Sequence, residues 1–210
     1  EGFAWRTNRD GSATIELRHA ATGRAHWRDC LHTHRYTLHP DGALAVENTV
    51  VLGARDMTDL PRVGVRLDLR SGFEQLRYFG RGPRENYADR KAAELIGVWA
   101  GTVTDEYVPY VMPQESGHHT DVRWLELSQG RKATLRVDGA PTFEFNATHF
   151  AAEDLYAAKH TTDLVSRPET LLYLDAAHRG LGTASCGPDT LPHYRLLKPR
   201  YTWRYVLDLK

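Results

Sequence analysis

Apolar and polar residues alternate along much of the chain. In the segment 62–71, the apolar residues are Val63, Val65, Leu67 and Leu69, and the residues between them are glycine, arginine and aspartate. Near the C-terminus, the apolar positions of the same pattern are Tyr201, Trp203, Tyr205, Leu207 and Leu209. Side chains that recur with a period of two lie on one face of a strand. Both segments therefore predict half-buried strands with one face on a core.

Shorter segments with a strand pattern follow one another at short spacing. They are 12–19, 35–51, 74–80, 121–127, 132–139, 142–148 and 169–177. Turn residues separate them at 8–11, 40–42, 71–72, 129–130 and 138–141, and the Pro-Asp-Gly turn at 40–42 predicts a hairpin. Only 151–161 predicts a short helix. The fold class expected is all-β: one large antiparallel β-sandwich over 1–210, with at most one short helix.

Composition narrows the classes of function. Lys+Arg and Asp+Glu both number 27, which gives a formal net charge of zero, so no field would steer the protein to nucleic acid or to a membrane surface. No run of apolar residues approaches the length of a membrane span, and no signal peptide pattern is present. We expect a cytoplasmic protein. Because the chain begins with Glu1 rather than methionine, we also expect it to be a piece of a longer polypeptide, trimmed at its N-terminus.

The chain has two cysteines, Cys30 and Cys186, which excludes a disulfide scaffold and a four-thiolate metal site. One disulfide between them is an alternative, but we favour two free thiols in a reducing compartment.

Two pairs of carboxylates could in principle act as a glycosidase pair: Glu85 with Asp89, and Glu115 with Asp121. Arginines next to them in sequence (Arg84, Arg90 and Arg123) would keep the carboxylates ionised, which suits a nucleophile but not a general acid. We therefore favour structural ion pairs.

Neither the histidines nor the glycine-rich segment 180–188 matches a catalytic or cofactor motif. The pairs His32 with His34 and His118 with His119 lack a third ligand at motif spacing, so hydrogen-bonded or surface histidines are favoured over a zinc site. The segment 180–188 matches neither nucleotide-binding glycine pattern, and it reads as a loop between the last strands.

Aromatic residues can fill a core or stack on sugar rings. The alternating ones, such as Trp203 and Tyr205, indicate core. Tyr87, Tyr107 and Tyr110 lie in predicted loops, where either role is open.

Several of these stretches resemble the C-terminal domain of bacterial glycoside hydrolase family 2 β-galactosidases. In 76–99, Gly82-Pro83, Glu85-Asn86-Tyr87 and Asp89-Arg90 match the family's G-P-x-E-N-Y-x-D-R block. The segment 105–127 resembles the family's Y-x-P-Y-x-x-P-x-E-N-G stretch, with Ser116 where asparagine is usual. The segments 143–150 and 178–207 extend the resemblance, which is weak before Leu60 and covers nearly the whole chain.

The resemblance implies a many-stranded supersandwich, similar in fold to galactose mutarotases, at the end of a much longer chain. It implies that the catalytic carboxylates, and the magnesium and sodium that the family uses, belong to other domains, above all a catalytic barrel. No catalytic residue and no cofactor are expected in this chain. The partners implied are the remaining domains, a galactoside substrate and further subunits of a homo-oligomer, with no nucleic acid and no membrane.

The resemblance also assigns roles within the chain. Some members of the family project a tryptophan from the last glycine-rich loop into the sugar pocket, and Cys186 falls at or next to its place. Cys186, with Ser185 and Gly187, would line a roomier pocket with weaker stacking. The stretch 81–90 would be a structural corner, in which Gly82 and Pro83 set the backbone while Arg84, Glu85, Asp89 and Arg90 form ion pairs beside Asn86.

Two other functions stay open. An independent carbohydrate-binding module would use Tyr87, Tyr107, Tyr110, Glu115 and His118. A mutarotase-like enzyme would use Glu115 with His118 or His119 as acid and base. The leading hypothesis, a pocket-completing domain of a β-galactosidase, predicts an exposed apolar patch where the barrel docks.

Overall fold

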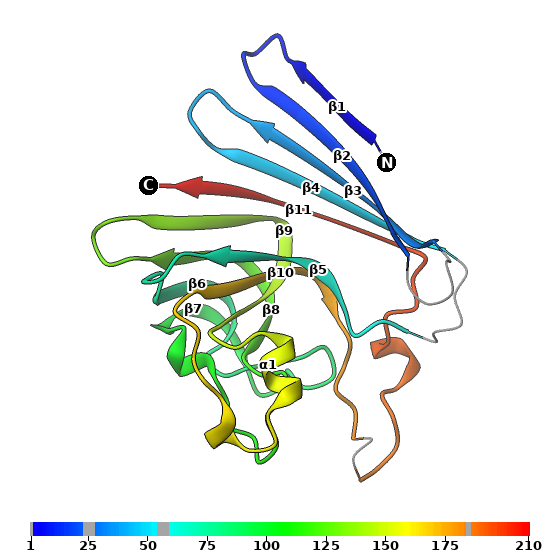
Figure 1. Ribbon diagram of the computed structural model, residues 1–210, viewed down its shortest axis with the longest axis vertical. Coiled ribbons are helices and arrows are strands. Elements are labelled where there is room, and N and C mark those ends of the chain that lie inside the picture. Colours follow the sequence, from blue (N-terminus) through cyan, green and yellow to red (C-terminus); the bar gives the residue numbers. More distant parts are fainter. Residues whose placement is uncertain (1, 23–27, 54–58, 184–185) are drawn as a thin grey trace.

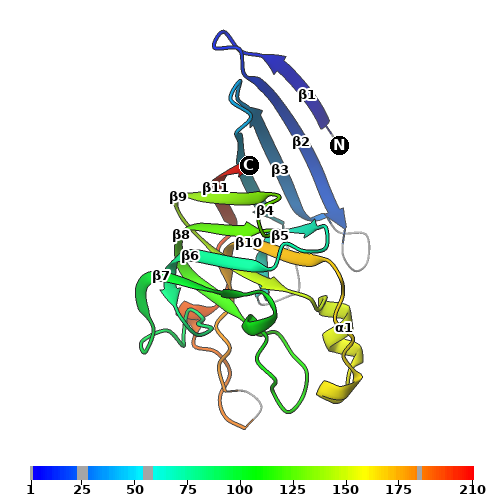
Figure 2. The same ribbon diagram turned by 90° about the vertical axis from the view of Figure 1, so that its left-hand side faces the viewer.

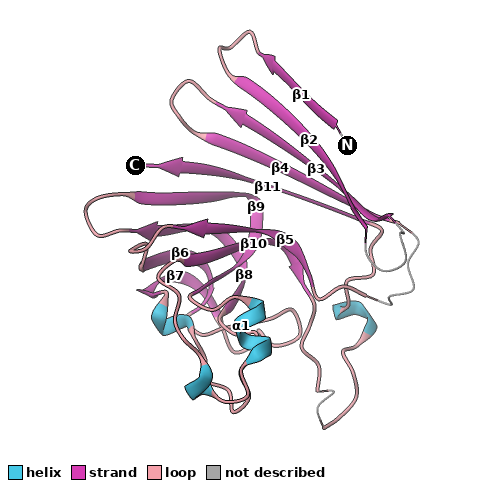
Figure 3. Ribbon diagram, viewed as in Figure 1, coloured by secondary structure: helices cyan, strands magenta, loops and turns pink. Residues whose placement is uncertain are grey.

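A computed structural model describes residues 2–22, 28–53, 59–183 and 186–210 of the chain. Within these residues the protein is built from eleven antiparallel strands and one six-residue α-helix, α1 (Ala152–Ala157) (Figure 1). The strands are β1 (Gly2–Thr7), β2 (Ala13–Thr22), β3 (Arg28–Leu38), β4 (Leu44–Leu52), β5 (Arg62–Leu69), β6 (Gln75–Gly82), β7 (Leu95–Thr102), β8 (His118–Ser128), β9 (Thr134–Thr148), β10 (Thr170–His178) and β11 (Arg200–Leu209). Short 3-10 turns occur at Thr104–Glu106, Thr161–Asp163 and Pro192–Tyr194, below the strands in Figure 3. The prediction of an all-β antiparallel fold with one short helix is confirmed.

The strands form a continuous sheet that branches at β9. One arm runs β1-β2-β3-β4-β11 to β9, and the other continues through β8 and β6 to β7. β11 pairs with the first part of β9, at Leu135–Gly139, while β10 pairs with its last part, at Glu144–Thr148, and carries β5 on its other edge. In Figures 1 and 2 the first arm rises above the rest of the molecule as a fan that ends at β1.

β9 differs from the sequence-based expectation. The turn residues at 138–141 predict two strands separated by a turn, but the structure has one 15-residue strand. The strand bends there instead: three exposed residues, Ala140–Thr142, interrupt its buried positions, and a Cβ on Gly139 would lie 2.7 Å from the Phe143 ring. Glycine is therefore required where the sheet changes direction.

The two arms share one hydrophobic core. Trp203 and Tyr205 of β11 are buried with Leu125 of β8, Phe145 of β9 and Leu172 of β10. Burying a side chain of this size stabilises a fold by about 1.5–3 kcal/mol. The alternation predicted for β5 and β11 is confirmed at these strands, except at Leu209, which is 67% exposed at the end of β11.

The predicted hairpin also forms. β3 and β4 pair from Cys30–Leu52 to Leu38–Leu44, and Gly42 adopts φ 92° in the turn. That φ lies in the left-handed region where glycine is favoured. Two strands that sequence patterns did not indicate, β1 and β7, lie at the outer ends of the sheet path.

Candidate functional site

The stretch 81–90 forms a corner between β6 and the segment leading to β7, and Asn86 anchors it in the interior. Asn86 has no exposed surface. Its Nδ2 donates to the carbonyl oxygens of Arg81 (2.9 Å) and Arg84 (3.0 Å), and its Oδ1 accepts from the amide (2.9 Å) and hydroxyl (2.7 Å) of Thr120. Its backbone amide donates to the carbonyl of His118 (2.7 Å). The corner is therefore tied to β8 by hydrogen bonds that water does not reach.

Charged side chains complete the corner. Arg84 pairs with Glu94 (3.0 Å), and Arg90 pairs with Glu85. Glu85 also accepts from the Tyr110 hydroxyl, and from the Gly117 amide at 2.8 Å. These contacts hold the 105–117 segment against the corner.

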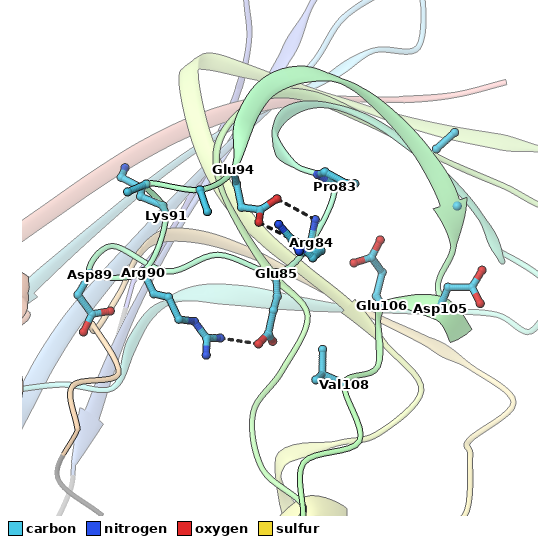
Figure 4. Close-up of a pocket in the computed structure, with 14 residues that line it drawn as sticks. Pro83, Arg84, Glu85, Asp89, Arg90, Lys91, Glu94, Asp105, Glu106 and Val108 are labelled. Atoms are coloured by element: carbon cyan, nitrogen blue, oxygen red, sulfur yellow. Dashed lines mark hydrogen bonds and ion pairs between the residues drawn. The ribbon is translucent and has the colours of Figure 1, made fainter. Parts of the chain in front are cut away.

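A cavity of about 950 Å³ opens beside the corner (Figure 4). Its described lining carries three basic and five acidic side chains and no aromatic ring: Arg84, Arg90, Lys91, Glu85, Asp89, Glu94, Asp105 and Glu106. Sugar sites usually offer a flat aromatic face, which this lining lacks. Its acids bond to protein groups, as Glu106 does to His119 (2.6 Å) and Asp105 to Thr102 (2.7 Å).

Asp89 reaches out of the corner to the glycine-rich segment after β10. Its Oδ1 accepts from the amide of Leu181 (3.0 Å) and its Oδ2 from the amide of Gly182 (2.7 Å). The corner and the segment are about ninety residues apart in sequence, yet they form one unit. Gly180 permits this approach, since a Cβ there would lie 2.7 Å from Cγ of Asp89.

The residues predicted to line a sugar pocket lie beyond this contact. Cys186 is exposed and its amide donates to the carbonyl of Thr183 (3.0 Å). Gly187 is exposed beside it. Ser185 lies outside the described residues. Cys30 and Cys186 are both free thiols, as the sequence predicts.

The candidate sugar-binding residues do not form a surface platform. Tyr87 and His118 have no exposed surface, so neither ring can stack on a sugar in this fold. Tyr107 and Tyr110 are partly exposed, but the Tyr107 ring packs on Phe150, at a centroid distance of 4.9 Å. The sequence placed Tyr87 and His118 in loops, as candidate sugar-binding residues. Because both side chains are buried, the structure corrects that interpretation.

The proposed acid–base pair of a mutarotase does not assemble either. Oε1 of Glu115 accepts from Nη2 of Arg62 (2.6 Å). His118 faces Glu144 (3.1 Å), and His119 faces Glu106 (2.6 Å). Glu115 therefore has an arginine as its partner, and both histidines are closed off from solvent.

Behind the corner lies a buried cluster of ionisable groups that sequence analysis missed. Asp175 on β10 has no exposed surface; Nε of Arg62 lies 3.0 Å from its Oδ2, without hydrogen-bond geometry. His118 lies 3.9 Å from the same carboxylate, and a Cβ on Gly64 would lie 1.8 Å from Oδ1. The one available signal was an aspartate in an otherwise apolar strand, Leu171–Ala177.

Burial sets the protonation of this cluster. It raises the pKa of Asp175 to about 8, although Arg62 opposes the shift, and it raises the pKa of Glu144 to about 7. Burial lowers the pKa of His118, and it lowers the pKa of His178 to about 3. The cluster thus holds neutral histidines and carboxyl groups that retain protons near neutral pH.

We expect the free energy of unfolding to fall as the pH rises from 6.5 to 8.5. In the unfolded chain both carboxyls would titrate near pH 4, so the folded state keeps a proton that the unfolded state has lost up to about pH 7 at Glu144 and up to about pH 8 at Asp175. A carboxyl group whose pKa is raised by folding stabilises the folded state fully below its pKa in the unfolded chain. This contribution is lost as the pH rises through its pKa in the folded state. Each proton that only the folded state retains lowers the free energy of unfolding by about 1.4 kcal/mol for each unit that the pH rises. The lowered histidine pKa values act in the opposite direction, but only below about pH 6.5.

Urea denaturation at several pH values checks this, with Asp175→Asn and the exposed Asp41→Asn as matched variants. The slope should flatten in Asp175→Asn and persist in Asp41→Asn. A slope that stays the same in both variants would show that Asp175 does not carry it.

No cluster among the described residues forms a metal site. His32 and His34 lie side by side on β3, with ring centroids 3.6 Å apart, but no three His, Cys, Asp or Glu side chains in the described part of the chain could hold one ion. Among the described residues, no helix has the length and hydrophobicity of a membrane span.

The fan of β1–β3 exposes an apolar surface. Phe3, Trp5, Ile15, Leu17 and Tyr36 share one face because Phe3 pairs with Leu17, Trp5 with Ile15, and Ile15 with Tyr36. We call these five residues the outer apolar face. Phe3 is 66% and Trp5 is 69% exposed, and across β3 and β4 the face continues through Val46 to Tyr205 in the core.

The opposite side of the fan is polar. There Glu16 pairs with Arg18 (2.8 Å) and Arg35 (3.0 Å), and Glu47 pairs with Arg35 (3.2 Å) and Arg204 (3.5 Å). Such exposed pairs add little stability, but they mark the side that faces water. The apolar side therefore has the chemistry of a core face that nothing in the described chain covers.

Comparison with known proteins places the chain in a family of glycosidase segments. The family model described as beta galactosidase small chain matches residues 3–207. The chain belongs to the β-galactosidase small-chain family, and the resemblance seen in its sequence is confirmed at that level.

Curated proteins similar to this chain are named β-galactosidase. The chain is 40% identical over 141 residues to a β-galactosidase of Arthrobacter sp. strain B7, and 32% identical over 174 residues to one of Priestia megaterium. These alignments cover 65% and 82% of this chain but 14% and 17% of those proteins. Among solved structures, a GalM/aldose epimerase homologue from C. elegans aligns with a TM-score of 0.45 and 10% identity, over 99% of this chain and 68% of that one.

Proposed function

We propose that this chain is the C-terminal domain of a larger, cytoplasmic β-galactosidase of glycoside hydrolase family 2. In this proposal it closes one side of the galactoside pocket through the loop that carries Cys186 and Gly187, and it contributes to subunit contacts. A catalytic barrel in the rest of the polypeptide supplies the carboxylates for hydrolysis of terminal β-galactosides. Magnesium and sodium, where the enzyme uses them, are held by those other domains.

The observation that carries the proposal is family membership together with the short share of each relative that the chain spans, 14–17% in the relatives named above. The outer apolar face supports it. An apolar sheet face this exposed calls for a covering surface, and the remaining domains of the same polypeptide would supply one.

The described residues also favour a non-catalytic role for the chain by itself. The carboxylates of the corner are held by arginine, tyrosine and backbone partners, as Glu85 is by Arg90 and Glu94 is by Arg84. A general acid needs a raised pKa and access to substrate. Asp175 and Glu144 have the raised pKa. However, Asp175 is fully buried, and the Glu144 carboxyl group bonds to His118 (3.1 Å) and to the His178 amide (2.8 Å). We therefore expect the isolated chain to be inactive.

Protection of Cys186 tests the pocket role. In the whole polypeptide, a non-hydrolysable thiogalactoside at ten times its dissociation constant should slow alkylation of Cys186 by iodoacetamide about tenfold, because about one site in eleven stays free. Alkylation is followed by mass spectrometry, with the half-buried Cys30 as an internal control. Equal rates with and without the sugar would show that the loop lies outside the pocket.

A further inference from the structure

We propose that Asp89 is a positioning residue for substrate selectivity: it fixes the loop that carries Cys186 and thereby sets how the pocket accepts the aglycone of a galactoside. This inference rests on the proposed function. It follows from the contact between the 81–90 corner and the glycine-rich segment, which neither stretch of sequence predicts by itself.

The carboxylate of Asp89 binds two consecutive backbone amides. Leu181 donates to Oδ1 at 3.0 Å and Gly182 donates to Oδ2 at 2.7 Å. Both oxygens are therefore used, and an ionised acceptor makes hydrogen bonds about twice as strong as neutral ones. An asparagine could accept only one of these amides and would turn its NH₂ group toward the other.

Asp89 is itself held in place. The amide of Tyr87 donates to the carbonyl of Arg90 (3.1 Å) and the amide of Arg90 donates back to Tyr87 (2.9 Å), so Asp89 sits in a closed turn. Tyr87 is fully buried and Asn86 is bonded to β8. The position of the carboxylate is thus set by the core.

The other contacts close the base of the loop, which we call the loop neck: residues 179–182 and 189–190. Arg179 donates to Asp189 (2.7 Å) and to Thr190 Oγ1 (2.8 Å), and Thr190 Oγ1 donates to the Gly180 carbonyl (2.8 Å). Gly182 has φ 64°, and a Cβ there would lie 2.7 Å from the Thr190 amide.

The neck is therefore tied on one side by Arg179 and on the other by Asp89. Arg179 also pairs with Asp59 (2.6 Å), so its side chain is shared among several partners. Asp89 is the one described side chain that bonds the Leu181 and Gly182 amides. A shift of the loop neck moves Cys186. In the proposed pocket, that movement would change the contacts of the leaving group more than those of the galactose, which the barrel holds.

The test uses the whole polypeptide with Asp89→Asn. As a matched control we choose Asp41→Asn, because Asp41 also accepts from a backbone amide, that of Ala43 (3.0 Å), in the β3–β4 hairpin away from the loop. Two properties are measured: hydrogen exchange at the Leu181 and Gly182 amides, and kcat and KM for an aryl galactoside and for lactose.

In Asp89→Asn we expect exchange at the two amides to be at least about tenfold faster, as expected when one strong hydrogen bond is lost. We expect the ratio of kcat/KM between the two substrates to change by about three- to tenfold, chiefly through KM. Asp41→Asn should change neither property. A general loss of folding would lower kcat/KM equally for both substrates and would not alter their ratio.

Unchanged exchange in Asp89→Asn would overturn the positioning role. Faster exchange with an unchanged substrate ratio would overturn the role in selectivity. The alkylation assay tests the proposed function independently of Asp89. If the proposed function is wrong, thiogalactoside will not protect Cys186 in the unsubstituted polypeptide.

Discussion

Replacing Asn86 with alanine should lower the free energy of unfolding by about 3–5 kcal/mol. In a site with no exposed surface, the side chain donates to two backbone carbonyls and accepts from the amide and hydroxyl of Thr120. Alanine would leave these groups without partners, and each buried polar group left unsatisfied costs about 1–3 kcal/mol. Guanidinium denaturation of the purified chain measures the loss.

Asn8→Ala provides the control. Asn8 also makes side-chain hydrogen bonds, to Ser12 (2.9 Å) and Thr14 (2.9 Å), but it lies half-buried at the β1–β2 hairpin. Without Asn8, Ser12 would still bond to Asp10 (2.7 Å) and Thr14 to Thr37 (3.3 Å). We expect a loss of about 1 kcal/mol there. Equal losses in the two variants would contradict the view that Asn86 anchors the corner in the core.

The alternation of apolar and polar residues predicted some strands correctly and divided another. Alternation predicted β5 and β11 because a half-buried strand repeats its environment every second residue. It predicted two strands at 132–148, because a turn motif and a bend within one strand use the same residues, and only the pairing of β9 with β10 and β11 decides between them.

Burial of polar and aromatic loop residues could not be predicted in this way. Tyr87 lies in a loop and still has no exposed surface, because its ring stacks on His118 at a centroid distance of 5.3 Å. The bonds from Asp89 to Leu181 and Gly182 join segments about ninety residues apart, and one sequence carries no local signal for such pairing. The resemblance to β-galactosidases identified the corner as important but did not show what it holds.

The prediction with the largest effect concerns the whole polypeptide. Deleting residues 1–210 from it should lower kcat/KM for β-galactosides by about 100-fold or more. Under the proposed function the deletion removes one wall of the pocket, and misplacement of substrate by about 1 Å costs that much. The separately produced chain should restore activity when added back. Its outer apolar face would then bury against the surface exposed by the deletion.

Trp5→Glu provides a matched variant for the add-back. Trp5 is 69% exposed, so a charge there should leave the fold of the chain intact while it weakens docking. Arg6→Glu, on the opposite face of the same strand, introduces the same side chain where the fan faces water. We expect Arg6→Glu to restore activity as the unsubstituted chain does, and Trp5→Glu to restore much less.

The add-back assay is the clearest test of whether the chain is a domain of a larger β-galactosidase. We expect the polypeptide that lacks residues 1–210 and the separate chain to be inactive alone and active when mixed. That result would show that the chain acts as a domain that completes a β-galactosidase. A deleted polypeptide with full kcat/KM, or a chain that hydrolyses β-galactosides by itself, would contradict that conclusion.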